Sequence, residues 1–201
     1  SRRGRSRARA RAYGLYGKLV LGFTGFVRAW HGVDRVLRFM AASGREDLFL
    51  LLVGDGDARA GLERLARELG IASRFAVTGI VQREDVAPHV AAFDIALQPA
   101  VVDYASPLKL FEYMALGKAI VAPASANILE VLDDGETALL FAPDEDAGLF
   151  RALAALAGDA ALRARLGAAA RARLIKRDYT WAGNAARVEA LAGTLLGRNR
   201  A

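Results

Sequence analysis

Short runs of aliphatic residues alternate along this chain with longer stretches in which apolar positions recur every three or four residues. Continuous runs rich in Val, Ile and Leu are typical of strands buried on both faces, and the longer repeats have the period of amphipathic helices. The runs predict strands at residues 18–24, 48–53, 75–78, 95–98, 119–122 and 138–141. Helices are expected between them, at about 33–42, 62–69, 85–92, 107–116 and 128–132.

Strand–helix alternation of this kind predicts an α/β fold, a Rossmann-like parallel sheet with helices on both faces. After Pro143 only helices rich in Ala, Leu and Arg are expected. The last of them, at about 180–196, places Val188, Leu191 and Leu195 on one stripe. In such a sheet, ligands bind beyond the carboxyl ends of the strands, so the loops that follow the strands are the place to look for functional residues.

Composition narrows the class of protein. The chain has 201 residues, of which 54% are apolar and 25% charged, which suits one globular domain or two small ones and excludes a disordered chain. Cysteine is absent, which excludes disulfides, thiolate nucleophiles and Cys-ligated zinc and fits a cytoplasmic location. No apolar run has the length of a membrane-spanning helix, and we expect neither a membrane span nor a secretory signal peptide.

The net charge of +6 has a local origin. The first eleven residues contain no acidic residue and carry Arg2, Arg3, Arg5, Arg7, Arg9 and Arg11. Residues 1–17 are therefore predicted to be a basic arm or interdomain linker, and residues 18–201 the folded domain. The arm either contacts phosphates or the lipids of a membrane surface, or is a solvated tail. Because it lacks interleaved aromatic residues that would stack on bases, we favour the tail and expect no nucleic-acid partner.

The loop after the first strand, residues 25–32, carries Arg28 and His31 between two glycines and just before a helix. Two donor side chains at a helix N-terminus suit a phosphate, because the free amides and the helix dipole there already favour an anion. An ordinary strand–helix turn, with Trp30 packed and Arg28 on the surface, explains the same residues equally well.

The loop after the second strand reads Gly54-Asp55-Gly56-Asp57. It lacks the third glycine of a dinucleotide-binding fingerprint and the GK[ST] of a P-loop. Asp55 and Asp57 resemble a metal-binding pair, but Asp57 also suits the N-cap of the following helix, and we expect no metal here. Close approach of the backbone to a ligand explains the glycines better.

The sequence DYASPLKLFEYMALGK, residues 103–118, is the most informative segment. Ser106 suits the N-cap of a helix, Pro107 its first position and Gly117 its end. The face that we expect to pack on the sheet consists of Leu108, Phe111 and Ala115.

Lys109 in this helix is unusual, because a cation in the first turn opposes the helix dipole unless an anion binds there. A bound diphosphate would make the position of this cation favourable, because Lys109 and the free helix amides would then point at the diphosphate together. Glu112, one turn further on, could accept hydrogen bonds from two adjacent ribose hydroxyls. The alternative is a surface Lys–Glu pair of little energetic value, and we favour the anion site.

Three runs, GFVRAWHGVDRVL, VGDGDARAGLERLARELGI and SPLKLFEYMALGKAIVAP, together resemble the donor-binding C-terminal domain of family 4 glycosyltransferases with the GT-B fold. The resemblance extends from about Leu19 to the C-terminal helix. It implies transfer, without metal or other cofactor, from a nucleotide-activated sugar to an acceptor held by an N-terminal domain. This chain would then be the donor half, either a fragment or the partner of another polypeptide, and inactive alone.

The resemblance assigns the diphosphate to Arg28 and His31 in the first loop and to the backbone of Leu108 and Lys109. His31 matches the usual Lys position, whereas Phe26 occupies the usual Arg position. These residues lie on two loops that share the carboxyl edge of the predicted sheet.

For the rest of the donor, Glu112 matches the second Glu of the family's E-x7-E motif, which holds the ribose. The first Glu, which normally contacts the sugar, is replaced by Tyr104, and the neighbouring Asp103 is a candidate substitute. Gly54 matches the glycine that faces the donor, and Ile80-Val81 lies where the base is usually cradled.

A non-catalytic nucleotide-binding or interaction domain on the same fold is the alternative, since a fold does not decide chemistry. An acceptor-binding domain upstream in the same gene would favour the transferase. We expect a cytoplasmic protein, with membrane contact only through the N-terminal domain or the basic arm.

Overall fold

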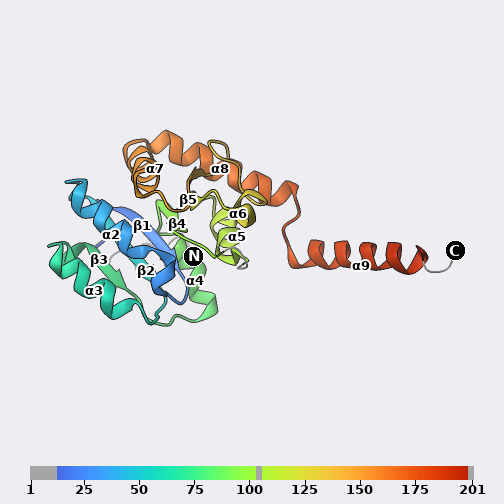
Figure 1. Ribbon diagram of the computed structural model, residues 1–201, viewed down its shortest axis with the longest axis horizontal. Coiled ribbons are helices and arrows are strands. Elements are labelled where there is room, and N and C mark those ends of the chain that lie inside the picture. The colour runs from blue at the N-terminus through green and yellow to red at the C-terminus, as the bar shows by residue number, and fades with distance from the viewer. Residues whose placement is uncertain (1–12, 103–105, 199–201) are drawn as a thin grey trace.

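The computed structural model describes residues 13–102 and 106–198 (Figure 1). Within these residues, six parallel strands form one sheet in the order β3-β2-β1-β4-β5-β6. The strands are β1 (Leu19–Thr24), β2 (Leu48–Val53), β3 (Phe75–Val77), β4 (Ile95–Leu97), β5 (Ala119–Pro123) and β6 (Leu139–Phe141). The helices are α2 (Val33–Ala42), α3 (Arg59–Glu68), α4 (Arg83–Val90), α5 (Leu108–Ala115), α6 (Ala126–Leu129), α7 (Asp146–Gly158), α8 (Ala160–Lys176) and α9 (Trp181–Arg198), with short 3-10 turns η1 (Ala29–His31) and η2 (Ala72–Arg74). Each predicted strand is present, and the α/β fold is confirmed.

Helices cover both faces of the sheet because successive strand side chains alternate between two cores. Leu21 and Leu50 belong to the core under α2, α3 and α7. Val20 and Leu51 belong to the core under α4, α5 and α6. Burial of apolar side chains on both sides explains why the strands read as continuous aliphatic runs.

The direction of strand addition reverses between β1 and β4, and this switch point positions the candidate site. β1 is in register with β2 from Leu19 to Thr24, whereas its register with β4 covers Leu21 and Gly22. The carboxyl ends of β1 and β4 therefore diverge. The loops that follow them have room to surround a ligand.

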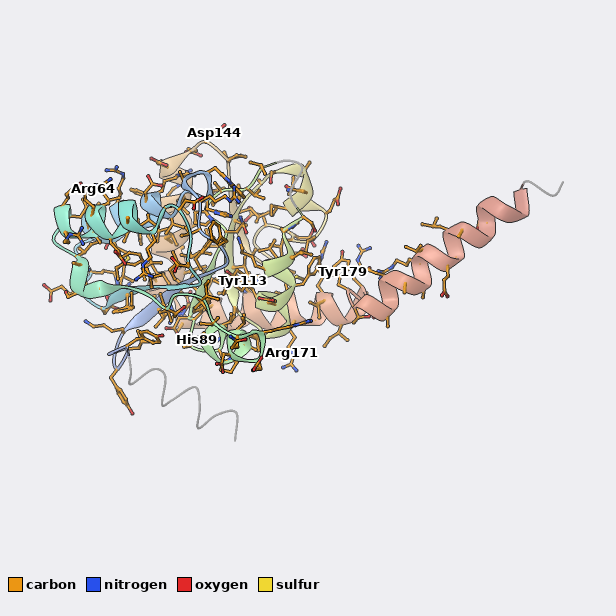
Figure 2. The ribbon with its side chains drawn as sticks, turned by 90° about the horizontal axis from the view of Figure 1, so that it is seen from below. Arg64, His89, Tyr113, Asp144, Arg171 and Tyr179 are labelled. Carbon is orange, nitrogen blue, oxygen red and sulfur yellow. The ribbon has the colours of Figure 1, made fainter. Side chains whose placement is uncertain are left out.

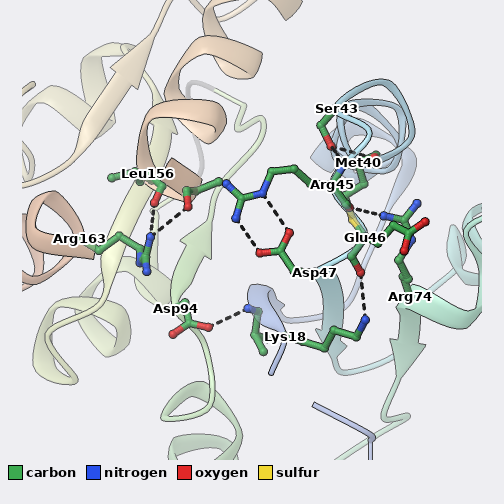
Figure 3. A network of polar contacts seen from close by, with 12 residues as sticks. Lys18, Met40, Ser43, Arg45, Glu46, Asp47, Arg74, Asp94, Leu156 and Arg163 are labelled. Atoms are coloured by element: carbon green, nitrogen blue, oxygen red, sulfur yellow. Dashed lines mark hydrogen bonds and ion pairs between the residues drawn. The ribbon is translucent and has the colours of Figure 1, made fainter. Parts of the chain in front are cut away.

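Polar contacts fasten the opposite, amino edge of the sheet (Figure 3). Arg45 and Asp47, just before β2, form two hydrogen bonds of 3.0 and 2.6 Å, and Arg74 donates to the backbone oxygen of Arg45. The carboxylate of Asp94, just before β4, accepts from the amide of Val20 at 2.8 Å. These contacts connect β1, β2, β3 and β4 at the edge that carries no predicted functional residue.

From β6 to residue 198, the regular elements are all helices, as predicted. α7 and α8 pack on the domain, whereas α9 extends away from it (Figure 1). On α9, Val188 and Leu191 of the predicted apolar stripe are each 65% exposed. None of the helices in the described part of the chain is long and apolar enough to cross a membrane.

The six arginines of the predicted basic arm fall in residues 1–12, outside the described residues. Residues 13–17, assigned to the same arm, form turns that lead into β1. Leu15 is buried there and belongs to the core under α4 and α5. The folded part of the chain therefore starts before residue 18.

Helix α5 begins one residue later than predicted and buries a different face. Pro107, not Ser106, occupies the N-cap, and Leu108 is the first helical residue. The side chains that α5 buries are Leu110, Tyr113 and Met114. The predicted sheet-facing Leu108 is instead 61% exposed. Six of the eight residues of this short helix are apolar or aromatic, so apolar side chains point in several directions and more than one face could meet the sheet.

The end of α5 is fixed by a contact between two glycines. Gly117 ends the helix, as predicted, with a φ of +62°. A Cβ atom on Gly167, in α8, would lie 2.1 Å from the backbone oxygen of Gly117. Glycine at position 167 therefore lets α8 pack directly against the end of α5.

We expect Gly167→Ala to lower the free energy of unfolding by about 1–3 kcal/mol, because backbone must move to make room for the methyl group. Gly61→Ala in α3 is the matched control, since the nearest atom to its Cβ is the Arg64 Nη2 at 3.9 Å. This control should be stabilising by about 0.5–1 kcal/mol. Urea unfolding measures both variants, and equal stabilities would contradict the close helix contact.

Candidate functional site

A cavity of about 410 Å³ opens at the carboxyl edge of the sheet, where β1 and β2 end and α5 begins. The predicted site residues that line it are Gly54, Ile80, Val81, Lys109 and Glu112. Arg28, His31 and Leu108 lie outside its lining, and Asp103 and Tyr104 lie outside the described residues. The cavity thus brings together residues from the loops after β1, β2 and β3 and from two helices, α4 and α5.

The loops after β1 and β2 meet backbone to backbone beside this cavity. A Cβ on Gly54 would lie 2.2 Å from the backbone oxygen of Gly25, and a Cβ on Gly56 2.1 Å from that of Val27. The φ angles of Gly54 and Gly56, 134° and 151°, are also rarely adopted by other residues. Contact between the two loops therefore accounts for these glycines, which the sequence had attributed to contact with a ligand.

Lys109 extends from the first turn of α5 over the ring of Phe23, with its Nζ 4.3 Å from the ring centroid. Within the described part of the chain, the ammonium group contacts this aromatic face and no carboxylate. Burial lowers the pKa of Lys109 to about 8, and the charge of Glu112 opposes the shift without cancelling it. An anion in the cavity would supply the missing counter-charge.

Glu112 lies one turn further along α5 and shares the cavity with Lys109. Burial raises the pKa of its carboxyl, and the positive charges of Lys109 and Arg83 act in the opposite direction. An ionised carboxylate offers only hydrogen-bond acceptors. A ligand placed here would therefore present hydroxyl groups to Glu112 and negative charge to Lys109.

His31 is buried beside the cavity, against Trp30 and the same Phe23 ring that Lys109 covers. Its Nδ1 accepts a hydrogen bond from the amide of Arg28 at 2.9 Å. Burial and the charges of Lys109 and Arg28 lower the pKa of His31 to about 4. The ring is therefore neutral at neutral pH, with its proton on Nε2, and would offer a phosphate a neutral donor rather than a cation.

The other two predicted phosphate contacts have different surroundings. The Arg28 guanidinium lies 5.5 Å from the ring centroid of Phe26, which lines the cavity. The Leu108 amide already donates to the backbone oxygen of Ser106 at 2.9 Å. Arg28 is thus close to the cavity wall, while the Leu108 amide is engaged within its own turn.

The apolar end of the cavity lies at the loop after β3. Ile80, Val81 and Val86 line it together with Phe26, and Ile80 is 84% exposed. Exposed aliphatic and aromatic side chains around a cavity suit a flat apolar group. The cavity therefore has a charged end at α5 and an apolar end at this loop.

Asp55 and Asp57, the pair that resembles a metal-binding motif, have different surroundings. One oxygen of Asp55 accepts from the amide of Gly56 at 2.9 Å, and the other lies 3.4 Å from Arg59. Asp57 is exposed, and Ala58, not Asp57, occupies the N-cap of α3. Across residues 13–102 and 106–198, no group of three or more His, Cys, Asp or Glu side chains is arranged to hold a metal ion.

Six residues of the cavity lining had no donor-site role assigned from the sequence: Thr24, Gly25, Phe26, Val53, Asp55 and Val86. Thr24 is the last residue of β1, and its position at the carboxyl end of a strand could have indicated a place in the site. Phe26 is 53% exposed, and an aromatic residue inside a glycine-bounded loop was the signal for it. Nothing in the local sequence of α4 marked Val86.

Residues 18–159 match the family described as Glycosyl transferases group 1, and the chain belongs to this family. The 2-deoxystreptamine glucosyltransferase of Streptomyces kanamyceticus is 28% identical over 145 residues, which cover 71% of this chain and 37% of that protein. The lipopolysaccharide core biosynthesis glycosyltransferase LpsD of Rhizobium meliloti is 32% identical over 149 residues, which cover 73% and 38%. The chain thus spans less than half the length of these curated relatives.

Solved structures share the fold. Anabaena Alr3699/HepE in complex with UDP aligns with a TM-score of 0.84 at 20% identity, over 94% of this chain and 53% of that one. The C-terminal domain of the glycosyl transferase group 1 family protein LpcC from Francisella tularensis aligns with a TM-score of 0.74 at 19% identity, over 88% and 92%. The predicted resemblance to the C-terminal domain of GT-B glycosyltransferases is confirmed.

The pKa of Lys109 leads to a prediction about the empty protein. Because this pKa falls from 10.5 to about 8 on folding, the unfolded chain binds more protons between these pH values, and Lys109 makes the folded state more stable as pH rises through them. Lys109→Met should remove this rise and stabilise the protein at neutral pH by about 1–2 kcal/mol, allowing for solvent screening of a partly exposed group.

Urea unfolding of parent and variant across this pH range measures the difference between their stabilities. The exposed Lys176, on α8, provides the control Lys176→Met, which should leave the pH dependence of stability unchanged. A Lys109→Met protein that is less stable than the parent at every pH would show that the lysine is structural.

Proposed function

We propose that this chain is the donor-binding half of a glycosyltransferase and holds a nucleotide-activated sugar in the cavity at the carboxyl edge of the sheet. The observation that carries the proposal is the partly buried Lys109 ammonium, one helical turn from Glu112 and without a carboxylate contact in the described residues. The polarity of the cavity, charged at α5 and apolar after β3, supports it.

The order of chemical groups in a nucleotide sugar matches this polarity. The diphosphate lies at Lys109, the ribose hydroxyls donate to Glu112, and the base rests against Ile80 and Val81. Arg28 and the neutral His31 assist at the diphosphate from the loop after β1. Asp103 and Tyr104 remain the candidates for contact with the sugar.

The acceptor and the remaining catalytic groups belong, in this proposal, to an N-terminal domain or a partner chain. The relatives support this division, because the matched part covers only 37% and 38% of their length. The chain alone would therefore bind donor without transferring it. We further propose a cytoplasmic location and donor binding without a divalent metal, as expected from the sequence.

A non-catalytic nucleotide-binding domain is the second candidate. It is consistent with the fact that this chain spans less than half the length of its glycosyltransferase relatives. Both candidates predict nucleotide binding. They differ once the chain is joined to an acceptor-binding domain, because only the transferase then consumes donor in an acceptor-dependent way.

Calorimetric titration with UDP, GDP and ADP, in the presence of a metal chelator, tests donor binding. We expect saturable binding of at least one nucleotide, and flat titrations with all three, using folded protein, would refute the proposal. Binding that strictly requires a divalent metal would contradict the metal-independent site.

Glu112→Gln tests the ribose contact. The amide keeps the shape but loses charge as an acceptor, so nucleotide affinity should fall by about tenfold while pyrophosphate binds as before. Glu136→Gln, in the turn before β6 and outside the cavity lining, is the matched control and should bind nucleotide like the parent. An equal loss for nucleotide and pyrophosphate would place Glu112 at the phosphates instead.

A further inference from the structure

Tyr113 has a fully buried side chain whose hydroxyl group lies where β1 and β4 diverge; Figure 2 shows it inside the domain. The Thr24 amide donates to the phenol oxygen at 3.0 Å, and the Thr24 hydroxyl lies 3.1 Å from it. The phenol hydroxyl is 3.4 Å from the backbone oxygen of Leu97, to which it donates. One hydroxyl group thus connects the last residues of β1 and β4.

This bridge also joins the two parts of the molecule that line the charged end of the cavity. Thr24 is followed directly by Gly25 and Phe26 of the cavity lining, and Tyr113 directly follows Glu112 on α5. The Phe93 ring packs edge-on against the Tyr113 ring, with the ring centroids 6.2 Å apart. The position of α5 relative to the loop after β1 therefore depends on this hydroxyl.

We propose that Tyr113 is a positioning residue for donor binding, whose hydroxyl holds Lys109 at the correct distance from the loop after β1. The inference rests on the proposed function, because it concerns the same cavity. Tyr113 itself contacts no ligand, since it is fully buried and its hydroxyl is occupied by Thr24 and Leu97. Its effect on binding must therefore pass through α5.

Tyr113→Phe removes the hydroxyl and keeps the ring. We expect the dissociation constant for UDP, or for whichever nucleoside diphosphate the parent binds, to rise by about tenfold. A double-mutant cycle with Lys109→Met measures the coupling between the two losses of affinity, and a merely structural role of Tyr113 would give no such coupling. If Tyr113 acts by placing Lys109, the two losses of affinity are not multiplicative, and Tyr113→Phe weakens binding by only about twofold in the Lys109→Met background.

Tyr179→Phe is the matched control, because the Tyr179 hydroxyl donates to the backbone oxygen of Glu130 and its ring packs on Phe111 of α5. This variant should bind nucleotide like the parent. If Tyr113→Phe does not give folded protein, Thr24→Val removes the hydroxyl that faces the Tyr113 hydroxyl. This variant then replaces Tyr113→Phe in the double-mutant cycle with Lys109→Met.

Two results would overturn the assignment of Tyr113: parent-like affinity in Tyr113→Phe, or losses that multiply fully with those of Lys109→Met. A parent protein that binds no nucleoside diphosphate would instead overturn the proposed function, and the role of Tyr113 with it. The titration of the parent therefore separates the two failures.

Discussion

Burial of the Lys109 ammonium group is the constraint around which the carboxyl edge of the sheet is organised. A cation in the first turn of a helix opposes the dipole of that helix, and partial burial adds a desolvation cost. The protein compensates in part through the face of the Phe23 ring, 4.3 Å away. The rest of the cost remains in the empty protein, where it lowers the pKa of the lysine to about 8, and a bound anion would relieve it.

The sheet topology and three close contacts place this lysine. β1 and β4 diverge at the switch point, and the Tyr113 hydroxyl occupies the divergence. The loops after β1 and β2 approach each other through glycine backbone, and α8 approaches the end of α5 through Gly167. The first contact depends on the hydroxyl of Tyr113, and the other two depend on glycines that leave no side chain between the backbones. Substitutions at these three contacts should therefore lower both stability and ligand affinity.

Much of the fold could be predicted from the sequence, because buried parallel strands leave a strong aliphatic signal and Gly117 ends its helix by its backbone conformation. Lys109 and Glu112 were found because a charge in the wrong place of a helix is visible locally. The buried face of α5 was predicted wrongly, since six of its eight residues are apolar or aromatic and more than one face could meet the sheet. The role of Tyr113 was not predictable, because its partner Thr24 is 89 residues away along the chain.

Proton uptake on nucleotide binding is the most direct test of the central claim, that a desolvated lysine awaits an anion. At about pH 8.5, Lys109 of the empty protein is largely neutral, whereas the phosphates of UDP, with a second pKa of about 6, are fully ionised. Calorimetry in buffers of different ionisation enthalpy should show uptake of more than about half a proton per UDP bound, since the diphosphate raises the pKa of the lysine. Tight binding at this pH without proton uptake would contradict the account.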